Sequence, residues 1–272
     1  MRKIRLLALD LDGTLTKSDK TVSEGNKEAL RLAQEKGVTI VLASGRPVLG
    51  VAHVADELGL DKTGGYVIAC TGARIIDWKT KEEIVKEVFP GKYVPEIIEA
   101  GKRTGISILS YNDIGVISEN TEDRYVQLEG YNNGIPVIRV EDLEAEIRED
   151  PVNMMAVGEP EKLLEAFETV FSPELGDKLM VFRSEPCFVE ILAQGCGKDT
   201  ALAKLCGMLG IQPEEVMACG DGLNDIPMLS FAGIGVAMEN GREEAKAAAD
   251  YIAPGNDDDG VAEAIRKFIL DV

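Results

Sequence analysis

Residues Ile4–Thr14, with the sequence IRLLALDLDGT, place two carboxylates directly after an apolar run. The apolar part is typical of a buried strand, and residues two apart in an extended segment point to the same side. We therefore expect Asp10 and Asp12 to lie together near the end of a parallel strand, where open α/β sheets bind ligands. Two close like charges need a cation or a shared proton to compensate them. The pattern thus indicates a divalent metal ion and phosphoryl transfer.

Two other interpretations of this segment compete with the first. Asp12-Gly13 is also a common hairpin dipeptide, so a plain turn stays open until other motifs are considered. A calcium loop that began at Asp10 would need an acidic residue at its twelfth position. That position holds Thr21, which excludes the calcium loop.

Composition narrows the function classes. The chain has 272 residues, which suits a large core in one or two domains. Its 29 basic and 48 acidic side chains give a net charge of −19, which argues against a nucleic-acid partner. The single histidine, His53, excludes a zinc site built on several histidines. A serine–histidine hydrolase would have to use His53 without a Gly-x-Ser-x-Gly elbow.

Cysteine usage and hydropathy suggest where the protein works. The five cysteines form no Cys-x-x-Cys pair, which is typical of reduced thiols. No apolar run approaches the length of a membrane span, and Asp10 interrupts the first one too early for a signal peptide. We expect a cytoplasmic protein without a membrane partner.

Both ends of the chain alternate between strand-like and helix-like segments. Besides the first apolar run, the predicted strands are Val38–Ala43, Tyr66–Cys70, Glu215–Cys219, Gly233–Ala237 and Tyr251–Ile252. The predicted helices between them are Glu24–Glu35, Asp199–Leu209, Arg242–Ala249 and Gly260–Leu270. Alternating βα units predict the α/β class, with a Rossmann-like parallel sheet covered by helices.

The middle of the chain has a different pattern. Predicted helices at Val94–Arg103 and Glu161–Val170 are mixed with strand-like segments, several of which alternate apolar and polar residues. The strand-like segments are Ile106–Ser110, Ile114–Ser118, Met154–Val157, Leu179–Phe182 and Phe188–Ile191. This pattern favours an antiparallel sheet with helices on one face. We expect an α+β domain at residues 82–191, inserted into a core formed by residues 1–81 and 192–272.

Two further motifs suit a phosphate group. Ser44-Gly45-Arg46 follows the strand Val38–Ala43, and a hydroxyl and a free N–H at a strand end can hold a phosphate oxygen. Lys198 opens a helical stretch, where the helix dipole disfavours a cation unless an anion binds there. An ordinary loop and an exposed lysine are the competing interpretations.

A last motif follows the strand Glu215–Cys219. The sequence GDGLND at residues 220–225 supplies two carboxylates, Asp221 and Asp225, and the amide of Asn224. Such hard oxygen ligands suit Mg²⁺. A calcium loop fails again, because its twelfth position is Ala232. A glycine-rich turn before an Asp-capped helix is the simpler alternative.

Taken in order, these motifs resemble the four motifs of the haloacid dehalogenase superfamily of phosphatases. The resemblance spans the chain and includes the position of the inserted domain. Three further stretches are similar to the Cof-type branch with a large α+β (C2B) cap: Thr71-Gly72-Ala73, Phe188–Ile191 and Gly233–Met238. The sequence departs from the branch at Thr71, where asparagine is usual, and at Cys196 and Asp199 beside the lysine.

The resemblance implies a role for each motif residue. Asp10 would be the nucleophile and form an aspartyl-phosphate, and Asp12 would protonate the leaving group and then activate water. Mg²⁺ would be bound by Asp10, the carbonyl oxygen of Asp12, Asp221 and Asp225. The implied phosphate-binding residues are Leu11, Ser44, Gly45, Lys198 and Asn224.

The expected function is therefore a Mg²⁺-dependent phosphatase. The resemblance implies small phosphorylated metabolites as substrates, with sugar phosphates commonest and flavin or nucleotide-precursor phosphates as further options. A phosphomutase of the same superfamily and a phospho-accepting signalling protein remain alternatives, although the latter would be a shorter unit. Dehalogenases lack the second aspartate. We expect a monomer or a weak homo-oligomer.

Overall fold

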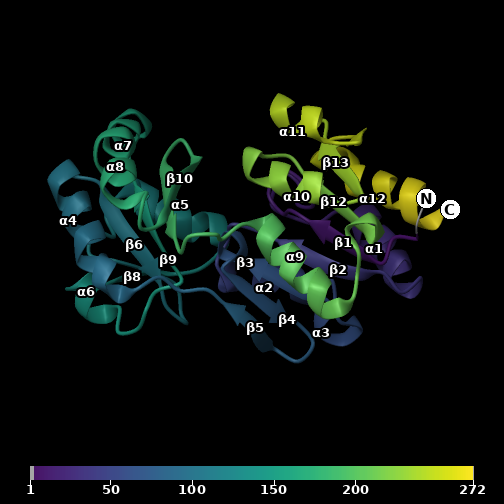
Figure 1. Ribbon diagram of the computed structural model, residues 1–272, viewed down its shortest axis with the longest axis horizontal. Coiled ribbons are helices and arrows are strands. Elements are labelled where there is room, and N and C mark those ends of the chain that lie inside the picture. Colours follow the sequence, from purple (N-terminus) through teal and green to yellow (C-terminus); the bar gives the residue numbers. More distant parts are fainter. Residues whose placement is uncertain (1–2, 272) are drawn as a thin grey trace. The chain divides into compact units, whose positions relative to one another are not determined.

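The computed structural model describes residues 3–271, which form two compact units (Figure 1). The first unit contains the residues up to Gly45, Val51–Val85 and the residues from Gly197 onward. The second contains Arg46–Gly50 and Lys86–Cys196. The divisions after Val85 and after Cys196 fall a few residues beyond those predicted from the sequence, whereas the grouping of Arg46–Gly50 with the second unit was not predicted.

The first unit is built on an eight-stranded sheet in the order β14-β13-β12-β1-β2-β3-β4-β5. The strands are β1 (Leu6–Leu9), β2 (Thr39–Ala43), β3 (Tyr66–Ala69), β4 (Arg74–Asp77), β5 (Glu82–Lys86), β12 (Val216–Gly220), β13 (Ile234–Met238) and β14 (Tyr251–Ala253). The pairs from β14 to β3 are parallel, and β4 is antiparallel to β3. The α/β class with a Rossmann-like parallel sheet is therefore confirmed.

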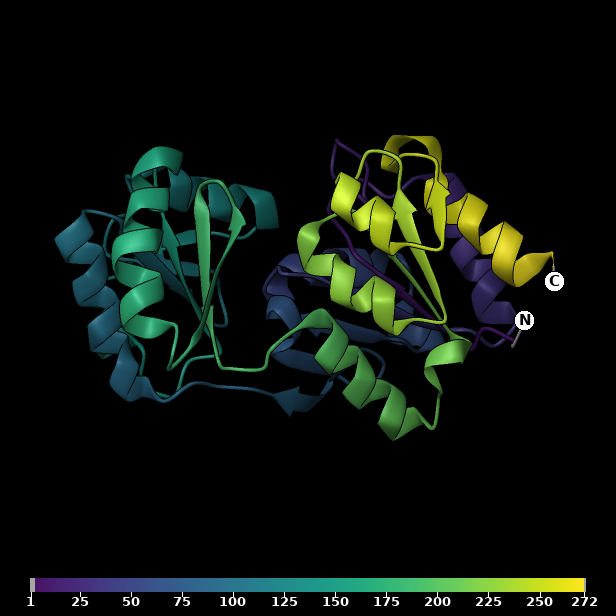
Figure 2. The same ribbon diagram turned by 45° about the horizontal axis from the view of Figure 1, so that its top comes forward.

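Helices cover both faces of this sheet. They are α1 (Glu24–Glu35), α2 (Val48–Glu57), α3 (Leu60–Thr63), α9 (Lys198–Leu209), α10 (Ile226–Phe231), α11 (Glu243–Ala248) and α12 (Gly260–Ile265). Leu6 and Ala8 of β1 share a buried cluster with Leu202 and Leu205 of α9. Figure 2 shows α1 and α12, which contact each other, away from α9 and α10. Burial from both sides explains why every residue of β1 is apolar.

The N-terminus of α1 is set by local chemistry that the sequence already carries. The side chain of Ser23 accepts a hydrogen bond from the backbone N–H of Asn26 and so caps the first turn. Ala29, Leu30 and Ala33 recur at helical spacing and are buried. The predicted helix Glu24–Glu35 is confirmed.

The second unit has a six-stranded sheet in the order β10-β11-β9-β6-β7-β8. Its strands are β6 (Ser107–Tyr111), β7 (Val116–Ser118), β8 (Val137–Arg139), β9 (Asn153–Val157), β10 (Met180–Glu185) and β11 (Phe188–Leu192). Its helices are α4 (Val94–Thr104), α5 (Arg124–Asn133), α6 (Leu143–Glu146), α7 (Pro160–Ala166) and α8 (Ser172–Leu175). The neighbours are antiparallel except β7 and β8, which are parallel.

The expectation of helices on one face of this sheet was wrong. Ile97 of α4 and Leu163 of α7 pack in the buried cluster on one face. Val126 of α5 packs in a second cluster with Leu109 and Met155. Residues 109 and 155 lie next to Ile108 and Met154 of the first cluster, and adjacent strand residues point to opposite faces. The sheet is therefore covered by helices on both sides.

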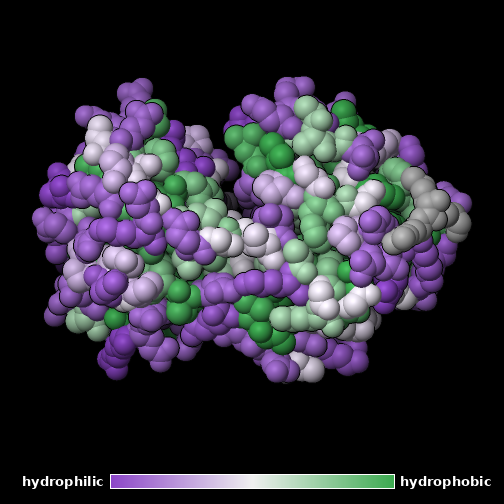
Figure 3. All heavy atoms as spheres, viewed as in Figure 1, coloured by the Kyte–Doolittle hydropathy of each residue, from purple (hydrophilic) through white to green (hydrophobic). Residues whose placement is uncertain are grey.

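The surface of the molecule seen in Figure 3 is largely polar, and its cysteines form no disulfides among the described residues. Figure 3 shows mostly hydrophilic side chains on the face in view. Within residues 3–271, no helix combines the length and the apolar character that a membrane crossing requires. All five cysteines are free thiols, and His53 is exposed on α2.

Candidate active site

The parallel pairing of β1 and β12 brings two distant motifs together. Leu9 lies opposite Cys219 in the register, so the residues that follow each strand are neighbours. The backbone N–H of Asp10 donates to the carbonyl of Cys219 at 3.0 Å. This pairing places Asp10 beside the loop that carries Asp221 and Asp225.

Lys198 lies between two of the carboxylates. Its Nζ donates to Asp10 Oδ1 and to Asp225 Oδ1, each at 2.6 Å, and the residue is 1% exposed. Burial alone lowers the pKa of Lys198, but Asp10 and Asp225 outweigh this effect and raise the pKa above its ordinary value. The side chain is therefore a buried ammonium ion, and the alternative of an exposed lysine is wrong.

Asp225 also orders the loop in which it lies. Its second oxygen accepts the backbone N–H groups of Asp221 at 3.0 Å and Gly222 at 2.9 Å. The carboxylate thus receives three hydrogen bonds and holds a single geometry.

Thr14 is a site residue that the motif analysis did not single out. Its hydroxyl donates to Asp221 Oδ1 at 3.0 Å. Its position two residues after Asp12 was the available sequence signal. Its partner, Asp221, follows a different strand, so only the fold shows that the two side chains meet.

Gly13 explains why the first motif continues with glycine. Its φ is +78°, which disfavours other L-residues. A Cβ at this position would also lie 2.5 Å from Asp221 Oδ2. The turn after Asp12 therefore needs glycine both for its backbone and for the approach of Asp221.

Three carboxylates form the most concentrated negative charge of the site. Oxygen atoms of Asp10, Asp221 and Asp225 all lie within 4.8 Å of one another. Together with the Lys198 ammonium they leave a formal charge of −3 + 1 = −2. An all-oxygen donor set with this charge fits a divalent cation such as Mg²⁺.

The pKa values of Asp10 and Asp221 show that the Lys198 ammonium compensates the carboxylates only in part. Burial raises the pKa of Asp10 well above its ordinary range, with Asp225 and Asp221 adding to the shift and Lys198 opposing it. Burial raises the pKa of Asp221 to about 6, with the nearby Asp225 carboxylate adding to the shift and the Thr14 hydroxyl opposing it. One ammonium ion is too little for two buried carboxylates and a half-buried one, so a bound cation would favour the ionised forms of Asp10 and Asp221.

Asp12 occupies a different environment from Asp10. Its carboxylate forms an ion pair with Lys20 at 2.7 Å, and its side chain is 40% exposed. It is not part of the cluster of Asp10, Asp221 and Asp225. The two carboxylates of the first motif are thus separated into a buried one and one that reaches solvent.

The Ser44 loop lies at the end of β2 and is joined to the loop after β3. Ser44 is 2% exposed, its N–H donates to Ile68, and its carbonyl accepts the N–H of Thr71 at 3.1 Å. Gly45 follows it, and a Cβ there would lie 3.4 Å from the Thr71 hydroxyl.

Thr71 itself has a φ of +50°. Asparagine tolerates this left-handed region better than a β-branched residue does. The local backbone therefore gives a physical reason for the asparagine that is usual here in the Cof-type branch.

Two predicted phosphate-binding residues lie outside the carboxylate cluster. Leu11 is fully buried, and its carbonyl accepts hydrogen bonds from the N–H of Thr14 and from Thr16. Asn224 is exposed on the loop between Asp221 and Asp225. Their roles remain predictions.

Comparison with known proteins identifies the family. The haloacid dehalogenase-like hydrolase family matches residues 7–265. A 5-amino-6-(5-phospho-D-ribitylamino)uracil phosphatase of Bacillus subtilis is 32% identical, and the match covers 98% of this chain and 96% of that protein.

Two solved structures are similar over nearly the whole chain. A haloacid dehalogenase-like hydrolase from Bacteroides thetaiotaomicron is 42% identical with a TM-score of 0.93, covering 97% of this chain and 99% of that one. A sugar phosphatase of haloacid dehalogenase subclass IIB is 27% identical with a TM-score of 0.81, covering 97% and 98%. The chain therefore belongs to the haloacid dehalogenase-like hydrolases and is an enzyme of this phosphatase family.

Proposed function

We propose that this protein hydrolyses small phosphate monoesters with Mg²⁺ as cofactor, through a phosphate ester on Asp10. The observation that carries the proposal is the buried Lys198 ammonium held between Asp10 and Asp225, beside a third carboxylate. A carboxylate can attack a phosphate dianion only where positive charge cancels the repulsion. The Lys198 ammonium supplies one positive charge, and the three carboxylates form a place where a divalent cation could supply more.

In the first step, a carboxylate oxygen of Asp10 attacks the phosphorus atom, and the bond from phosphorus to the leaving-group oxygen breaks. Lys198, Ser44 and the N–H of Gly45 would neutralise the charge that spreads over the phosphoryl oxygens. The Lys198 Nζ lies 2.6 Å from Asp10, so it can orient the nucleophile and contact the group transferred to it.

Asp12 would move the protons. It gives a proton to the departing alkoxide and then takes one from the water that attacks the aspartyl-phosphate, which frees Asp10 and inorganic phosphate. Its partial exposure supports this role, because a carboxylate that reaches solvent can exchange protons with water, whereas buried Asp10 cannot do so as easily.

Mg²⁺ would be held by Asp10, Asp221 and Asp225, with the Asp12 carbonyl as the further ligand that the resemblance implies. When bound, it would supply electrostatic stabilisation of the phosphoryl oxygens. The cluster geometry and its charge of −2 support a divalent ion.

The substrate is proposed to carry its phosphate on a polyhydroxylated carbon chain, with sugar phosphates as the first choice. Support comes from two relatives, one named for a phosphorylated ribityl compound and one named a sugar phosphatase. None of the proposed catalytic side chains lies in residues 82–191. We infer that this inserted domain decides which leaving groups are accepted.

Metal removal tests the proposal. We expect EDTA to abolish phosphate release from a panel of sugar and ribityl phosphates, and excess Mg²⁺ to restore it, because three carboxylates would otherwise repel the substrate. Excess Na⁺ serves as the control for ionic strength. Full turnover by metal-free protein would contradict the proposed cofactor, and absence of any phosphate release from the panel would contradict the proposed substrate class.

A further inference from the structure

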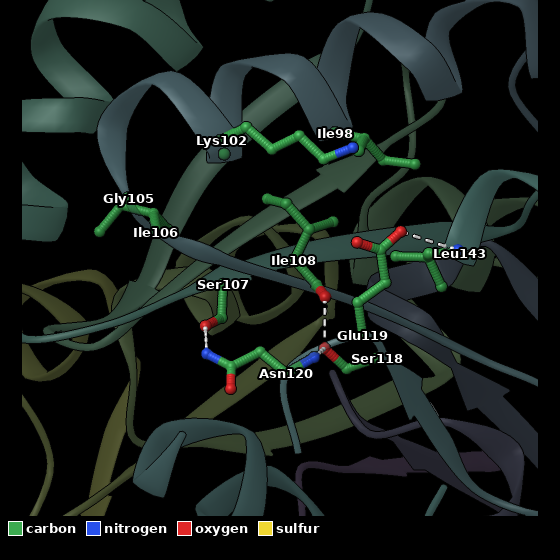
Figure 4. Close-up of a pocket in the computed structure, with 11 residues that line it drawn as sticks. Ile98, Lys102, Gly105, Ile106, Ser107, Ile108, Ser118, Glu119, Asn120 and Leu143 are labelled. Carbon is green, nitrogen blue, oxygen red and sulfur yellow. Dashed lines mark hydrogen bonds between the residues drawn. The ribbon is translucent and has the colours of Figure 1, made fainter. Parts of the chain in front are cut away.

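The second unit contains a cavity that lies apart from all residues proposed for catalysis. Its volume is about 250 Å³, and it opens between α4, α6, the start of β6 and the end of β7 (Figure 4). All its lining residues belong to Lys86–Cys196. Pockets for drug-sized ligands usually measure about 300–1,000 Å³, so this cavity suits a smaller molecule.

The lining includes an apolar surface that belongs to the hydrophobic core. Ile98, Ile108 and Leu143 line the cavity and are buried members of the cluster beneath α4. Gly101 lets α4 approach the sheet, since a Cβ there would lie 2.5 Å from Ile108 Cγ1. The cavity therefore reaches the edge of the core, where a small apolar group could contact Ile98 and Ile108.

The polar side of the cavity is partly fixed in place. The amide of Asn120 donates to the Ser107 hydroxyl at 3.0 Å, and that hydroxyl donates to Asp123 at 2.6 Å. The N–H of Leu143 donates to one carboxylate oxygen of Glu119 at 3.0 Å. Glu119 is thereby oriented, and its other oxygen has no hydrogen bond among the described residues.

Lys102 and Glu119 carry opposite charges but do not pair with each other. Figure 4 shows the Lys102 side chain along α4 beside Ile98, with the Glu119 carboxylate and Ile108 next to each other below it. Within residues 3–271 the Lys102 ammonium has no ion pair, whereas Arg103 beside it pairs with Glu174. Lys102 is exposed, so its ammonium group at the rim of the cavity is open to an anionic group of a ligand.

We propose that this cavity binds a free α-amino acid with an aliphatic side chain. The ligand carboxylate would contact Lys102, its ammonium group would donate to the unused oxygen of Glu119, and its side chain would cover Ile98 and Ile108. An amino acid satisfies both charges and the apolar surface at once. A simple carboxylate or amine would satisfy one charge only. This inference does not depend on the proposed phosphatase chemistry.

Calorimetric titration of the intact protein with L-leucine tests the proposal. The matched probes are 4-methylpentanoate, which lacks the amine, 3-methylbutylamine, which lacks the carboxylate, and glycine, which lacks the side chain. We expect saturable binding of leucine and at least about tenfold weaker binding of each probe, a difference of about 1.4 kcal/mol.

Variants locate the site. Lys102→Met and Glu119→Gln should each weaken leucine binding at least about tenfold, whereas Glu99→Gln, an exposed acid on α4 outside the cavity, should not change it. Circular dichroism of each variant checks that it is folded. The proposal fails if leucine does not bind up to its solubility limit, or if binding is unchanged in both cavity variants.

Discussion

Both units bury carboxyl groups, but they compensate them differently. In the first unit, Asp10 and Asp225 share the Lys198 ammonium at 2.6 Å each. In the second, Glu190 of β11 is 4% exposed, accepts one hydrogen bond from Ser184, and has a second oxygen without a partner. The described residues place no cation on Glu190.

The difference acts on the pKa of each carboxyl group. Burial, with the nearby Glu129 carboxylate adding to it, raises the pKa of Glu190 to about 8, although the Ser184 hydroxyl opposes the shift. Glu190 is therefore mostly a neutral acid at pH 7, while the first unit holds a fixed positive charge among its carboxylates. Burial alone gives a neutral carboxyl group. Beside Asp10, the Lys198 ammonium opposes the rise in pKa that burial causes, and a bound cation would add the further positive charge that an ionised nucleophile needs.

The largest effect is expected from Lys198→Met. Removing the ammonium leaves Asp10 and Asp225 buried without their partner, and loss of one member of a buried ion pair costs about 3–5 kcal/mol. Urea unfolding in EDTA measures this cost, and phosphate release should fall to background in the same variant. Lys204→Met, which changes an exposed lysine on the same helix, is the control. If Lys198→Met left stability and activity unchanged, the Lys198 ammonium would not be what compensates the buried carboxylates of the first unit.

Asp12→Asn should have a smaller and purely catalytic effect. The side chain is 40% exposed and lies outside the carboxylate cluster, so the fold should tolerate the amide. Loss of general acid–base catalysis should lower kcat by at least ~10². Asp19→Asn, an exposed carboxylate in the same loop, serves as the matched variant and should retain full kcat. If both variants were equally active, Asp12 would have no role in proton transfer.

Glu190→Gln should change stability in a pH-dependent way. Between the ordinary pKa of 4.5 and the folded value of about 8, the unfolded chain releases a proton that the native chain keeps. Stability from this group is therefore lost as pH rises through that window, at about 1.4 kcal/mol per pKa unit. A glutamine side chain does not titrate. The urea midpoint of the variant, relative to that of the parent, should therefore be higher at about pH 8 than at about pH 5.

The exposed neighbour Glu185 provides the control, since Glu185→Gln should shift the midpoint equally at both pH values. A Glu190→Gln midpoint that runs parallel to the parent would mean that Glu190 is ionised in the native protein.

Sequence patterns predicted the first unit better than the second. The βα alternation identified the parallel sheet, because strands buried on both faces are continuously apolar, as in β1 and β12. Helix α5 and strand β8 were missed. The sequence of α5, RYVQLEGYNN, has only a weak apolar stripe, and β8 spans three residues.

The sequence predicted those site residues that belong to a motif within one segment. It did not predict the contacts that form only when distant strands pair. Asp10, Lys198 and Asp225 each follow a glycine-rich or apolar segment and were identified as motif residues. Their common contact, and the Thr14–Asp221 hydrogen bond, arise only when β1 and β12 become neighbours. No spacing rule within one segment contains that information.

The central claim is that Asp10 carries the phosphoryl group, and trapping that group tests it most directly. Asp12→Asn protein, which should form the aspartyl-phosphate slowly and also hydrolyse it slowly, is mixed with a sugar phosphate labelled with ³²P and Mg²⁺ and quenched in acid at a series of times. We predict hydroxylamine-sensitive label on the peptide that contains Asp10, and none in Asp10→Asn protein. Release of labelled phosphate by the Asp12→Asn protein, with no label on that protein at any time, would contradict the claim that Asp10 carries the phosphoryl group.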